Sequence, residues 1–444
     1  MTAPVAGRSR WGAVTVVALG IVLTALDMTI VAVALPTIGA DLGAPPSTAQ
    51  WVLLGYSLPL VALSLPAGRW LDRAGPLPAF RLAVGGFGVA SALLTVAPTI
   101  EVLVTARVLQ GAFGALVSVV GLPLVADAVR PEHRARAMSL VLTLIPLSGV
   151  AGPALGGVLT DVAGWRTIFL VNLPVVAVAL ALSGRTIPAR RPGRAGLPRP
   201  DRAAVVDAVL LGVGVTALVL ALDLLGAGPR AAGGAALLAC AAAAAIGAWA
   251  RRPGTRPVLA LLRLPRIALG LVALLATVAG VGAVNFLVPY VLAAAVDATT
   301  IGLVLLVLSA AMALTSPPAG LLADRYGTAP VVLAGTIAVL AGAGWLLAVP
   351  AEPLALAGPL VLVGIGNGLI AGPNATRILD ATPAAQMGAG SGLQSLVRTF
   401  GFTLGPALAA LVWTTGGGLR PGALLLVVLA VVGLVAAAPW PRAR

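Results

Sequence analysis

Long apolar stretches separated by short polar breaks follow one another along the whole chain. Windows of about 20 apolar residues, each long enough to cross a bilayer as an α-helix, occur fourteen times. The predicted spans are 12–38, 48–67, 77–97, 101–124, 137–160, 165–184, 205–226, 231–249, 267–293, 299–322, 329–349, 353–375, 388–413 and 421–438. This pattern predicts an all-α polytopic membrane protein with about 14 transmembrane helices.

The composition excludes a water-soluble fold. The 444 residues are 59% hydrophobic and only 9% charged, with a mean hydropathy of +1.06, whereas soluble proteins carry about 25% charged residues. Cys240 and His133 are the single residues of their types, so neither a disulfide framework nor a cysteine- or histidine-based metal site can form. We therefore expect no metal and no cofactor.

The net charge of +14 indicates membrane orientation rather than nucleic-acid binding. All 28 basic residues are arginines, and most lie in the breaks between spans. If the N-terminus is cytoplasmic, only three arginines of these breaks fall outside: Arg166, Arg230 and Arg420. Because cytoplasmic loops are enriched in arginine, we expect both termini in the cytoplasm and no nucleic-acid partner.

One segment occurs twice and divides the chain. Residues 66–75 (PAGRWLDRAG) are repeated 252 positions later as residues 318–327 (PAGLLADRYG). Both copies follow an even-numbered span, which predicts two parallel six-helix halves with spans seven and eight inserted between them. The expected parts are an N-terminal half (1–184), a cytoplasmic linker (185–204), two inserted helices with a cytoplasmic loop (205–266) and a C-terminal half (267–444).

Four motifs resemble those of one transporter family. Residues 68–75 and their copy are similar to the GxLaDRxG loop of the major facilitator superfamily. Residues 26–36 (LDMTIVAVALP) are similar to the LDxTIVNVALP motif of its fourteen-span drug:proton antiporters, and 107–111 (RVLQG) to their RxxQG motif. Residues 149–157 (GVAGPALGG) resemble the antiporter motif GxxxGPxxGG of span five. The resemblance covers essentially the whole chain and implies the major facilitator fold.

The repeated loop is expected to act as a conformational latch. Its glycines allow two helices and a turn to approach closely, and its aspartate can accept from a helix N-terminus or an arginine. The alternative is a static turn between consecutive helices. The residues concerned are Gly68, Asp72, Arg73 and Gly75 in the first half, and Gly320, Asp324, Arg325 and Gly327 in the second.

Asp27 and Arg107 are the expected proton-coupling residues. An ionised carboxylate as deep as Asp27 is costly unless it is paired, hydrated or protonated, so we expect it to face the central cavity. Arg107 either relays charge with Asp27 or anchors helices through Gln110 and backbone carbonyls. The alternative for Asp27 is a buried structural hydrogen bond. Asp207 and Asp223, near the ends of span seven, are expected to be ordinary interfacial carboxylates.

The motif of span five places small residues on one bendable, close-packing face. In the family that it resembles, this motif marks exporters rather than importers. The alternative is generic packing through glycine. Its residues are Gly149, Gly152, Pro153, Gly156 and Gly157.

Aromatic and amide side chains in the spans are candidates for substrate binding, through stacking and a few hydrogen bonds. Taken singly, most aromatic residues in spans pack or lie at interfaces. The candidates are Trp51, Tyr56, Gln110, Phe113, Asn285, Phe286, Tyr290, Asn367, Asn374, Gln394 and the mid-span Arg398.

Together these features predict a proton-coupled efflux antiporter that exports an amphipathic, drug-like or antibiotic small molecule by alternating access. The alternatives are a proton-coupled symporter or a dedicated exporter of a single metabolite. An enzyme is not expected, because the loops offer no paired carboxylates or His–Asp constellations. With one deep carboxylate, a monocation or a neutral compound fits better than a dication. We expect a monomer in the bacterial plasma membrane whose partners are substrate, protons and lipid.

Overall fold

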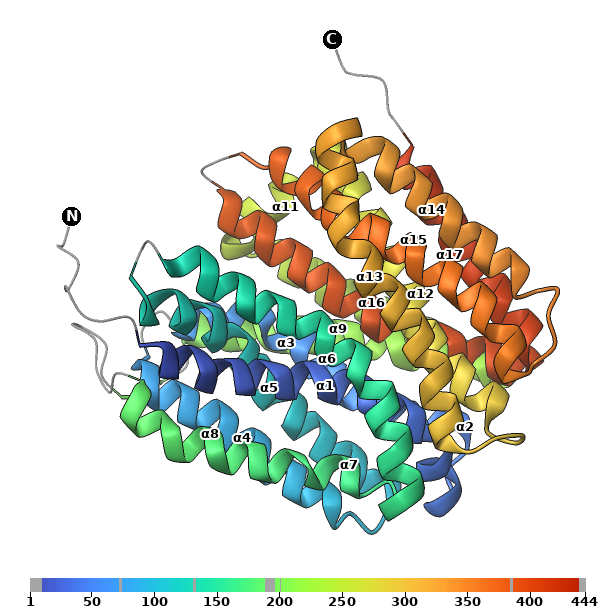
Figure 1. Cartoon of the computed structure of the whole chain (residues 1–444), viewed down its shortest axis with the longest axis horizontal. Coiled ribbons are helices and arrows are strands. Elements are labelled where there is room, and N and C mark those ends of the chain that lie inside the picture. The colour runs from blue at the N-terminus through green and yellow to red at the C-terminus, as the bar shows by residue number, and fades with distance from the viewer. Residues whose placement is uncertain are drawn as a thin grey trace.

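The computed structural model describes residues 10–71, 74–130, 133–187, 196–199, 201–383 and 386–438, and the regular elements in these ranges are helices (Figure 1). Each of the fourteen predicted spans coincides with a long helix or with two consecutive ones. In the first part of the chain these are α1 (Trp11–Asp41), α3 (Trp51–Leu71), α4 (Pro76–Thr95), α5 (Ile100–Ala128), α6 (Arg134–Ala163) and the pair α7 (Thr167–Leu170) and α8 (Asn172–Thr186). The others are α9 (Arg202–Gly226), α10 (Ala232–Ala250), α12 (Pro265–Leu292), α13 (Ala298–Tyr326), α14 (Thr328–Trp345), α15 (Pro353–Asp380), α16 (Met387–Gly416) and α17 (Leu419–Ala437).

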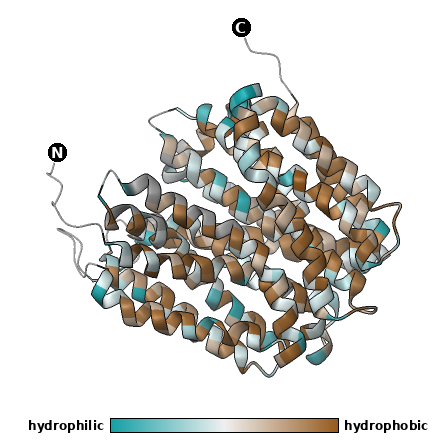
Figure 2. Cartoon of the chain, viewed as in Figure 1, coloured by the Kyte–Doolittle hydropathy of each residue, from teal (hydrophilic) through white to brown (hydrophobic). Residues whose placement is uncertain are grey.

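The outer surface of these helices is suited to lipid. Among the described residues, 12 helices are long and apolar enough to cross a membrane, and α3 and α6, of 21 and 30 residues, coincide with the other two predicted spans. Leu237, Leu314 and Leu354 are 72%, 78% and 89% exposed, and brown, hydrophobic residues occupy much of the helices in Figure 2. Exposed apolar surface on this scale is unfavourable in water. The prediction of an all-α polytopic membrane protein is therefore confirmed.

Local sequence fixes where several helices begin. Asp297 caps α13, because its Oδ1 accepts from the backbone N–H of Thr300 at 2.8 Å. Thr99 caps α5 in the same way. Prolines, which have no N–H to satisfy, occupy the first position of α4, α12 and α15.

The helices form two groups with matching internal packing. In the first group α1 packs on α6, α3 on α5, and α4 on α5 and α8; in the second α12 packs on α16, α13 on α15, and α14 on α15 and α17. Figure 1 shows the first group in blue to green and the second in yellow to red, side by side. The packing therefore follows the repeat in the sequence, whereas the domain boundaries stated above stay predictions.

Helix α9 touches both groups. It packs on its neighbour α10, on α3 of the first group and on α16 of the second. Val215 and Val219 of α9 form one apolar cluster with Leu54 and Leu58 of α3, and Phe400 of α16 packs against this cluster. Helix α9 thus covers the seam between α3 and α16.

The two groups meet most closely where α6 crosses α13. Asp161, near the end of α6, accepts from the first backbone N–H groups of α13, those of Ala298 at 3.2 Å and Thr299 at 2.7 Å. The hydroxyl of Thr299 also donates to this carboxylate at 2.6 Å. A carboxylate at a helix N-terminus is favourable, so Asp161 ties the groups together at the end of the bundle where α6 ends and α13 begins.

Candidate coupling site and substrate cavity

Asp27 lies in the interior of α1 and is 1% exposed. Its Oδ2 accepts from Nη1 of Arg107 on α5, and the side chains of this ion pair are both 0% exposed. Its Oδ1 accepts from Nε2 of Gln110 at 3.2 Å and from Nδ2 of Asn172 at 3.2 Å. Both oxygens of the buried carboxylate are therefore satisfied by donors from α5 and α8, as burial requires.

Ser91 of α4 completes this arrangement. Its hydroxyl accepts from Nε2 of Gln110 at 2.9 Å and from Nδ2 of Asn172 at 3.3 Å, and donates to the carbonyl of Phe87 at 2.9 Å. We call Asp27, Ser91, Arg107, Gln110 and Asn172 the coupling cluster. Ser91 and Asn172 were not among the predicted site residues, because no charge separates them from the other neutral polar residues of the spans.

Arg107 makes the contacts that both of its predicted roles require, whereas the charge relay itself stays a prediction. Besides pairing with Asp27, its Nη1 donates to Oε1 of Gln110 and its Nε to the carbonyl of Val52 at 2.9 Å. The guanidinium carbon lies 4.4 Å from the centre of the Tyr56 ring, within the range of a cation–π contact. Its buried Nη2 has no hydrogen-bond partner among the described residues. The guanidinium therefore depends mainly on Asp27 for charge compensation.

A proton would change the energetics of this cluster sharply. Protonating Asp27 removes the negative charge that compensates Arg107, and an unpaired buried charge is strongly destabilising. The pair can therefore convert proton binding into a preference for a different helix arrangement, provided that the new arrangement gives Arg107 another partner or water.

A small cavity lies between the two groups of helices, next to the coupling cluster. We call it the central cavity, and its empty space, including the part open to solvent, is about 400 Å³. The sequence predicts that Asp27 faces such a cavity, but Arg107 and Tyr56 line it and Asp27 is not among the lining residues, because its carboxylate is buried against its donors. The lining residues are Met28, Ala32, Leu53, Tyr56, Ser57, Arg107, Gly282, Asn285, Phe402 and Pro406.

The predicted substrate-binding residues fall into several places. Tyr56 and Asn285 line the central cavity, and Gln110 belongs to the coupling cluster. Gln394 and Arg398 lie two turns and one turn before the lining residue Phe402 on α16. The remaining candidates pack within the helix bundle. Phe113 lies against Gly86 of α4, and Trp51 lies at the edge of the apolar cluster between α3 and α9. Phe286 contacts Tyr290, which contacts Trp413, and Asn374 donates to the carbonyl of Gly270.

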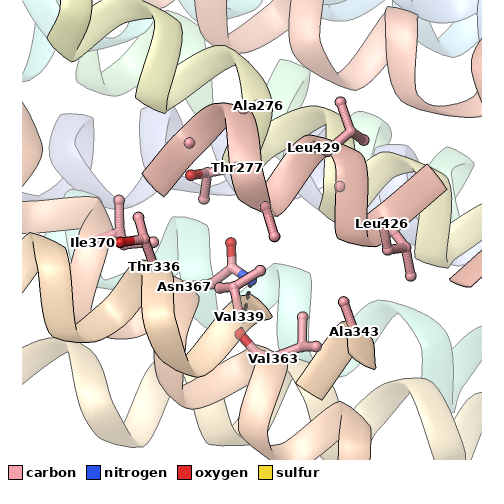
Figure 3. Close-up of a pocket in the computed structure, with 13 residues that line it drawn as sticks. Ala276, Thr277, Thr336, Val339, Ala343, Val363, Asn367, Ile370, Leu426 and Leu429 are labelled. Atoms are coloured by element: carbon pink, nitrogen blue, oxygen red, sulfur yellow. Dashed lines mark hydrogen bonds between the residues drawn. The ribbon is translucent and has the colours of Figure 1, made fainter. Parts of the chain in front are cut away.

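Asn367 lies at a different cavity, inside the second group of helices. In Figure 3 its side chain projects from α15 into the space lined by residues of α12, α14 and α17. Its Nδ2 donates to the carbonyl of Val363 at 2.8 Å, whereas its buried Oδ1 has no partner. The surrounding side chains are mainly apolar, including Val339, Ile370 and Leu426. Asn367 is therefore not brought together with Tyr56 and Asn285.

Comparison with known proteins decides the family. The model of the Major Facilitator Superfamily matches residues 17–295 and 270–444, which together cover nearly the whole chain. The chain belongs to the major facilitator superfamily. The resemblance drawn from the motifs is confirmed, and this membership makes the chain a transporter and not an enzyme.

Three curated relatives illustrate its place within the superfamily. The uncharacterized transporter YebQ of Escherichia coli is 29% identical, covering 98% of this chain and 97% of the relative. The multidrug resistance protein Stp of Mycobacterium tuberculosis is 32% identical over 88% of this chain and 73% of its own length. A Streptomyces coelicolor protein named Probable actinorhodin transporter is 30% identical over 90% of this chain and 72% of its own length.

In this major facilitator protein the motif of span five lies on α6 and faces two neighbours. A Cβ on Gly152 would overlap the side chain of Thr29 on α1, and one on Gly156 would overlap the carbonyl of Ile30. A Cβ on Gly157 would overlap the carbonyl of Ala298 on α13. The carbonyl of Pro153 approaches Gly302 of α13 equally closely. Gly149, by contrast, has open space around its Cβ position. Four of the five motif residues therefore mediate close helix contacts, and the role of the motif in export stays a prediction.

The two copies of the superfamily loop differ in their surroundings. Asp72 and Arg73 lie outside the described residues, and for Gly68 only its place in α3 is described. The N–H of Gly75 donates to the carbonyl of Gly196 at 2.8 Å, and Nε1 of Trp70 donates to that of Pro198 at 2.9 Å. The described linker residues 196–199 thus pack against the first loop.

The second copy is more open. Gly320 has no neighbour near its Cβ position, and Gly327 ends α13 with a φ of 87°, a conformation that favours glycine. Asp324 and Arg325 are exposed, and the guanidinium of Arg325 lies 5.2 Å from the centre of the adjacent Tyr326 ring. Within the described chain, no hydrogen bond or ion pair engages Asp324, so the latch role of both copies stays a prediction.

The prediction for Asp207 is corrected by the structure. Asp207 is 3% exposed and forms an ion pair with Arg252, whose Nη2 also donates to the carbonyl of Ala203 at 3.3 Å. Asp207 therefore holds the segment after α10 against the start of α9 and is not an ordinary interfacial carboxylate. Asp223, at the other end of α9, accepts from Nε2 of Gln50 at 3.0 Å.

Proposed function

We propose that this major facilitator protein is a proton-coupled antiporter that exports an amphipathic small molecule by alternating access. One observation carries the proposal: a fully buried carboxylate–guanidinium pair, Asp27 and Arg107, adjoins the cavity between the two groups of helices. A proton gradient supplies the energy, and the protein uses no cofactor.

The coupling follows from the geometry of the cluster. A proton that reaches Asp27 from outside neutralises it, and Arg107 loses its counter-ion while it lines the central cavity. The arrangement in which both are buried then becomes less stable relative to one that gives Arg107 water or a new partner. A ligand shifts such an equilibrium only by its differential affinity for the two states, so antiport requires that the substrate favours the arrangement in which Asp27 and Arg107 stay paired.

The direction of transport is supported by sequence and by relatives. The motif on α6 resembles that of exporters, and two relatives carry names that refer to multidrug resistance and to actinorhodin transport. We place the protein in the bacterial inner membrane as a monomer with both termini in the cytoplasm, as the arginine distribution favours. The name of the actinorhodin relative also keeps a dedicated exporter of one metabolite as a second candidate.

The proposal is tested with inverted vesicles that contain the full chain and carry an imposed proton gradient. The wild type is expected to move fluorescent dyes in a gradient-dependent manner. Asp27→Asn keeps the size and most hydrogen bonds of the side chain but cannot release a proton, so gradient-driven transport should fall to the level of empty vesicles. Dye binding without a gradient should persist.

The matched control is Asp41→Asn, on the same helix. Asp41 is 48% exposed and forms an ion pair with Arg166 at 2.9 Å, so its substitution should leave transport within about twofold of wild type, as expected for a surface pair. Gradient-dependent transport at wild-type rate by Asp27→Asn would refute the coupling role. Dye movement along with protons, instead of against them, would favour the symporter.

A further inference from the structure

Helix α16 has three sides covered by other helices. Gly401 and Gly405 face α12, where a Cβ on Gly401 would lie 3.0 Å from the Cβ of Val278. Leu396 and Phe400 pack against the apolar cluster formed by α3 and α9. Because α9 covers the seam between α3 and α16, the lipid side of this part of α16 is occupied.

The remaining face of α16 is polar and leads to the central cavity. Ser391, Ser395 and Arg398 are exposed on it, and Phe402, one helical turn after Arg398, lines the cavity. Residues four apart lie on the same face of an α-helix. Arg398 therefore projects from the wall that approaches the central cavity from the end of the bundle where α16 begins.

Arg398 is a cation without a partner. Within the described chain its guanidinium makes no hydrogen bond and no ion pair, in contrast to Arg107, which is paired with Asp27. A guanidinium in a membrane span needs an anion or a water-filled cavity. Its five N–H groups match the geometry of a carboxylate.

A second unused donor lies one turn from Arg398. Gln394 is 8% exposed, and its buried Nε2 has no hydrogen-bond partner in the part of the chain that the structure describes. An unsatisfied buried amide is costly, so this N–H group is suited to a ligand. Both unused groups on this face are donors, and the buried carboxylate of the coupling cluster, Asp27, already accepts from three side chains.

We propose that the transported molecule carries an anionic group, such as a carboxylate, that Arg398 and Gln394 bind while its apolar body rests against Phe402 in the central cavity. This inference rests on the proposed function only in taking the central cavity as the transport site. An anionic substrate differs from the monocation or neutral compound that the sequence favours. The reason for the change is that both carboxylate oxygens of Asp27 already accept hydrogen bonds from other side chains.

The test measures dye binding by fluorescence anisotropy to the full-length protein in lipid nanodiscs, without any gradient. The probes are fluorescein, which is an anion at pH 8, the uncharged dye Nile red and the cation rhodamine 6G. The wild type should bind fluorescein at least about tenfold more tightly than the uncharged dye or the cation, as a charge-assisted hydrogen bond predicts. Arg398→Gln should abolish this difference, and Arg398→Lys should keep part of it.

Arg420→Gln is the matched control, because Arg420 is an exposed residue at the start of α17 and its loss should not alter the preference. Size-exclusion profiles show whether each variant is folded, and Arg398→Lys provides the comparison if Arg398→Gln is not. Equal binding of the three probes, a preference for rhodamine 6G, or an equal effect of Arg420→Gln would overturn the inference.

The same probes separate this inference from the proposed function. Proton-driven, Asp27-dependent transport of rhodamine 6G with no binding of fluorescein would support antiport and overturn the anionic substrate. Arg398-dependent binding of fluorescein with no gradient-dependent transport of any probe would support the anionic substrate and overturn antiport.

Discussion

Three side chains donate to the single carboxylate of Asp27, and this number separates it from the other polar residues of the spans. Charge alone makes Asp27 and Arg107 detectable in the sequence, because charged residues are rare in apolar segments. Ser91 and Asn172 could not be told apart from other neutral polar residues. Thr277 and Asn285, for example, also lie in a span but donate to carbonyls of their own helix, and only the packing of helices reveals the difference.

At this scale we predict the effect of removing Arg107. Arg107→Gln leaves the buried carboxylate of Asp27 without its counter-ion, which should destabilise the protein by about 3–5 kcal/mol. Thermal unfolding of the purified protein in detergent measures the change.

The double variant Asp27→Asn with Arg107→Gln provides the control. It removes both charges, so it should recover much of the stability that Arg107→Gln loses. Equal unfolding temperatures of Arg107→Gln and the double variant would contradict the prediction that the charge of Arg107 compensates that of Asp27.

At the scale of elements, apolar length determined the spans but not their ends. The predicted span 12–38 is part of α1, which continues to Asp41. Asp41 accepts from Nε1 of Trp165 at 2.9 Å and from Arg166, and such distant contacts cannot be deduced from hydropathy. The short helices α2 (Pro46–Ala49) and α11 (Arg256–Leu261) were not predicted, because helices of so few residues depend on tertiary packing.

The contact between α6 and α13 provides a prediction at this scale. Gly157→Ala places a methyl group against the carbonyl of Ala298, and such overpacking costs about 1–3 kcal/mol. The protein should therefore favour states in which α6 and α13 separate. Labelling of a cysteine introduced at Thr299 by a membrane-impermeant maleimide should become faster.

Gly149→Ala is the control within the same motif, because the Cβ position of Gly149 has no neighbour within 4 Å. Its labelling rate and transport should match those of the unsubstituted protein. If both glycine variants behave alike, the effect of the motif does not come from contact with α13.

At the scale of the whole molecule, α9 constrains how the two groups can move. Its ties to the first group are more extensive, since Gln50 donates to Asp223 and Gly212 lies against Ala62 of α3. Its tie to the second group includes Gly226 against Thr414 of α16. We therefore expect α9 to move with the first group, while α16 slides along it.

Two engineered disulfides test this expectation in a Cys240→Ser background, since Cys240 is exposed. A Cβ on Gly212 would lie 3.3 Å from that of Ala62, and one on Gly226 would lie 3.5 Å from that of Thr414, close to the spacing in disulfides. Oxidation of the Ala62→Cys/Gly212→Cys pair should leave transport largely intact.

Oxidation of the Gly226→Cys/Thr414→Cys pair should stop transport, and reduction should restore it. The reduced form of each pair serves as its own control. Block by the first disulfide and tolerance of the second would show that α9 moves with the second group instead.

The pairing of Asp27 with Arg107 also affects how the chain is made. The two residues are 80 positions apart, so α1 leaves the ribosome long before α5 exists. Each charge alone costs about 2.5–3.5 kcal/mol at the centre of an inserted helix. Until α5 arrives, α1 must therefore remain near the insertion machinery or settle with its carboxylate neutral. The residues that we propose respond to protons in the finished transporter thus also constrain the order in which its first helices can assemble.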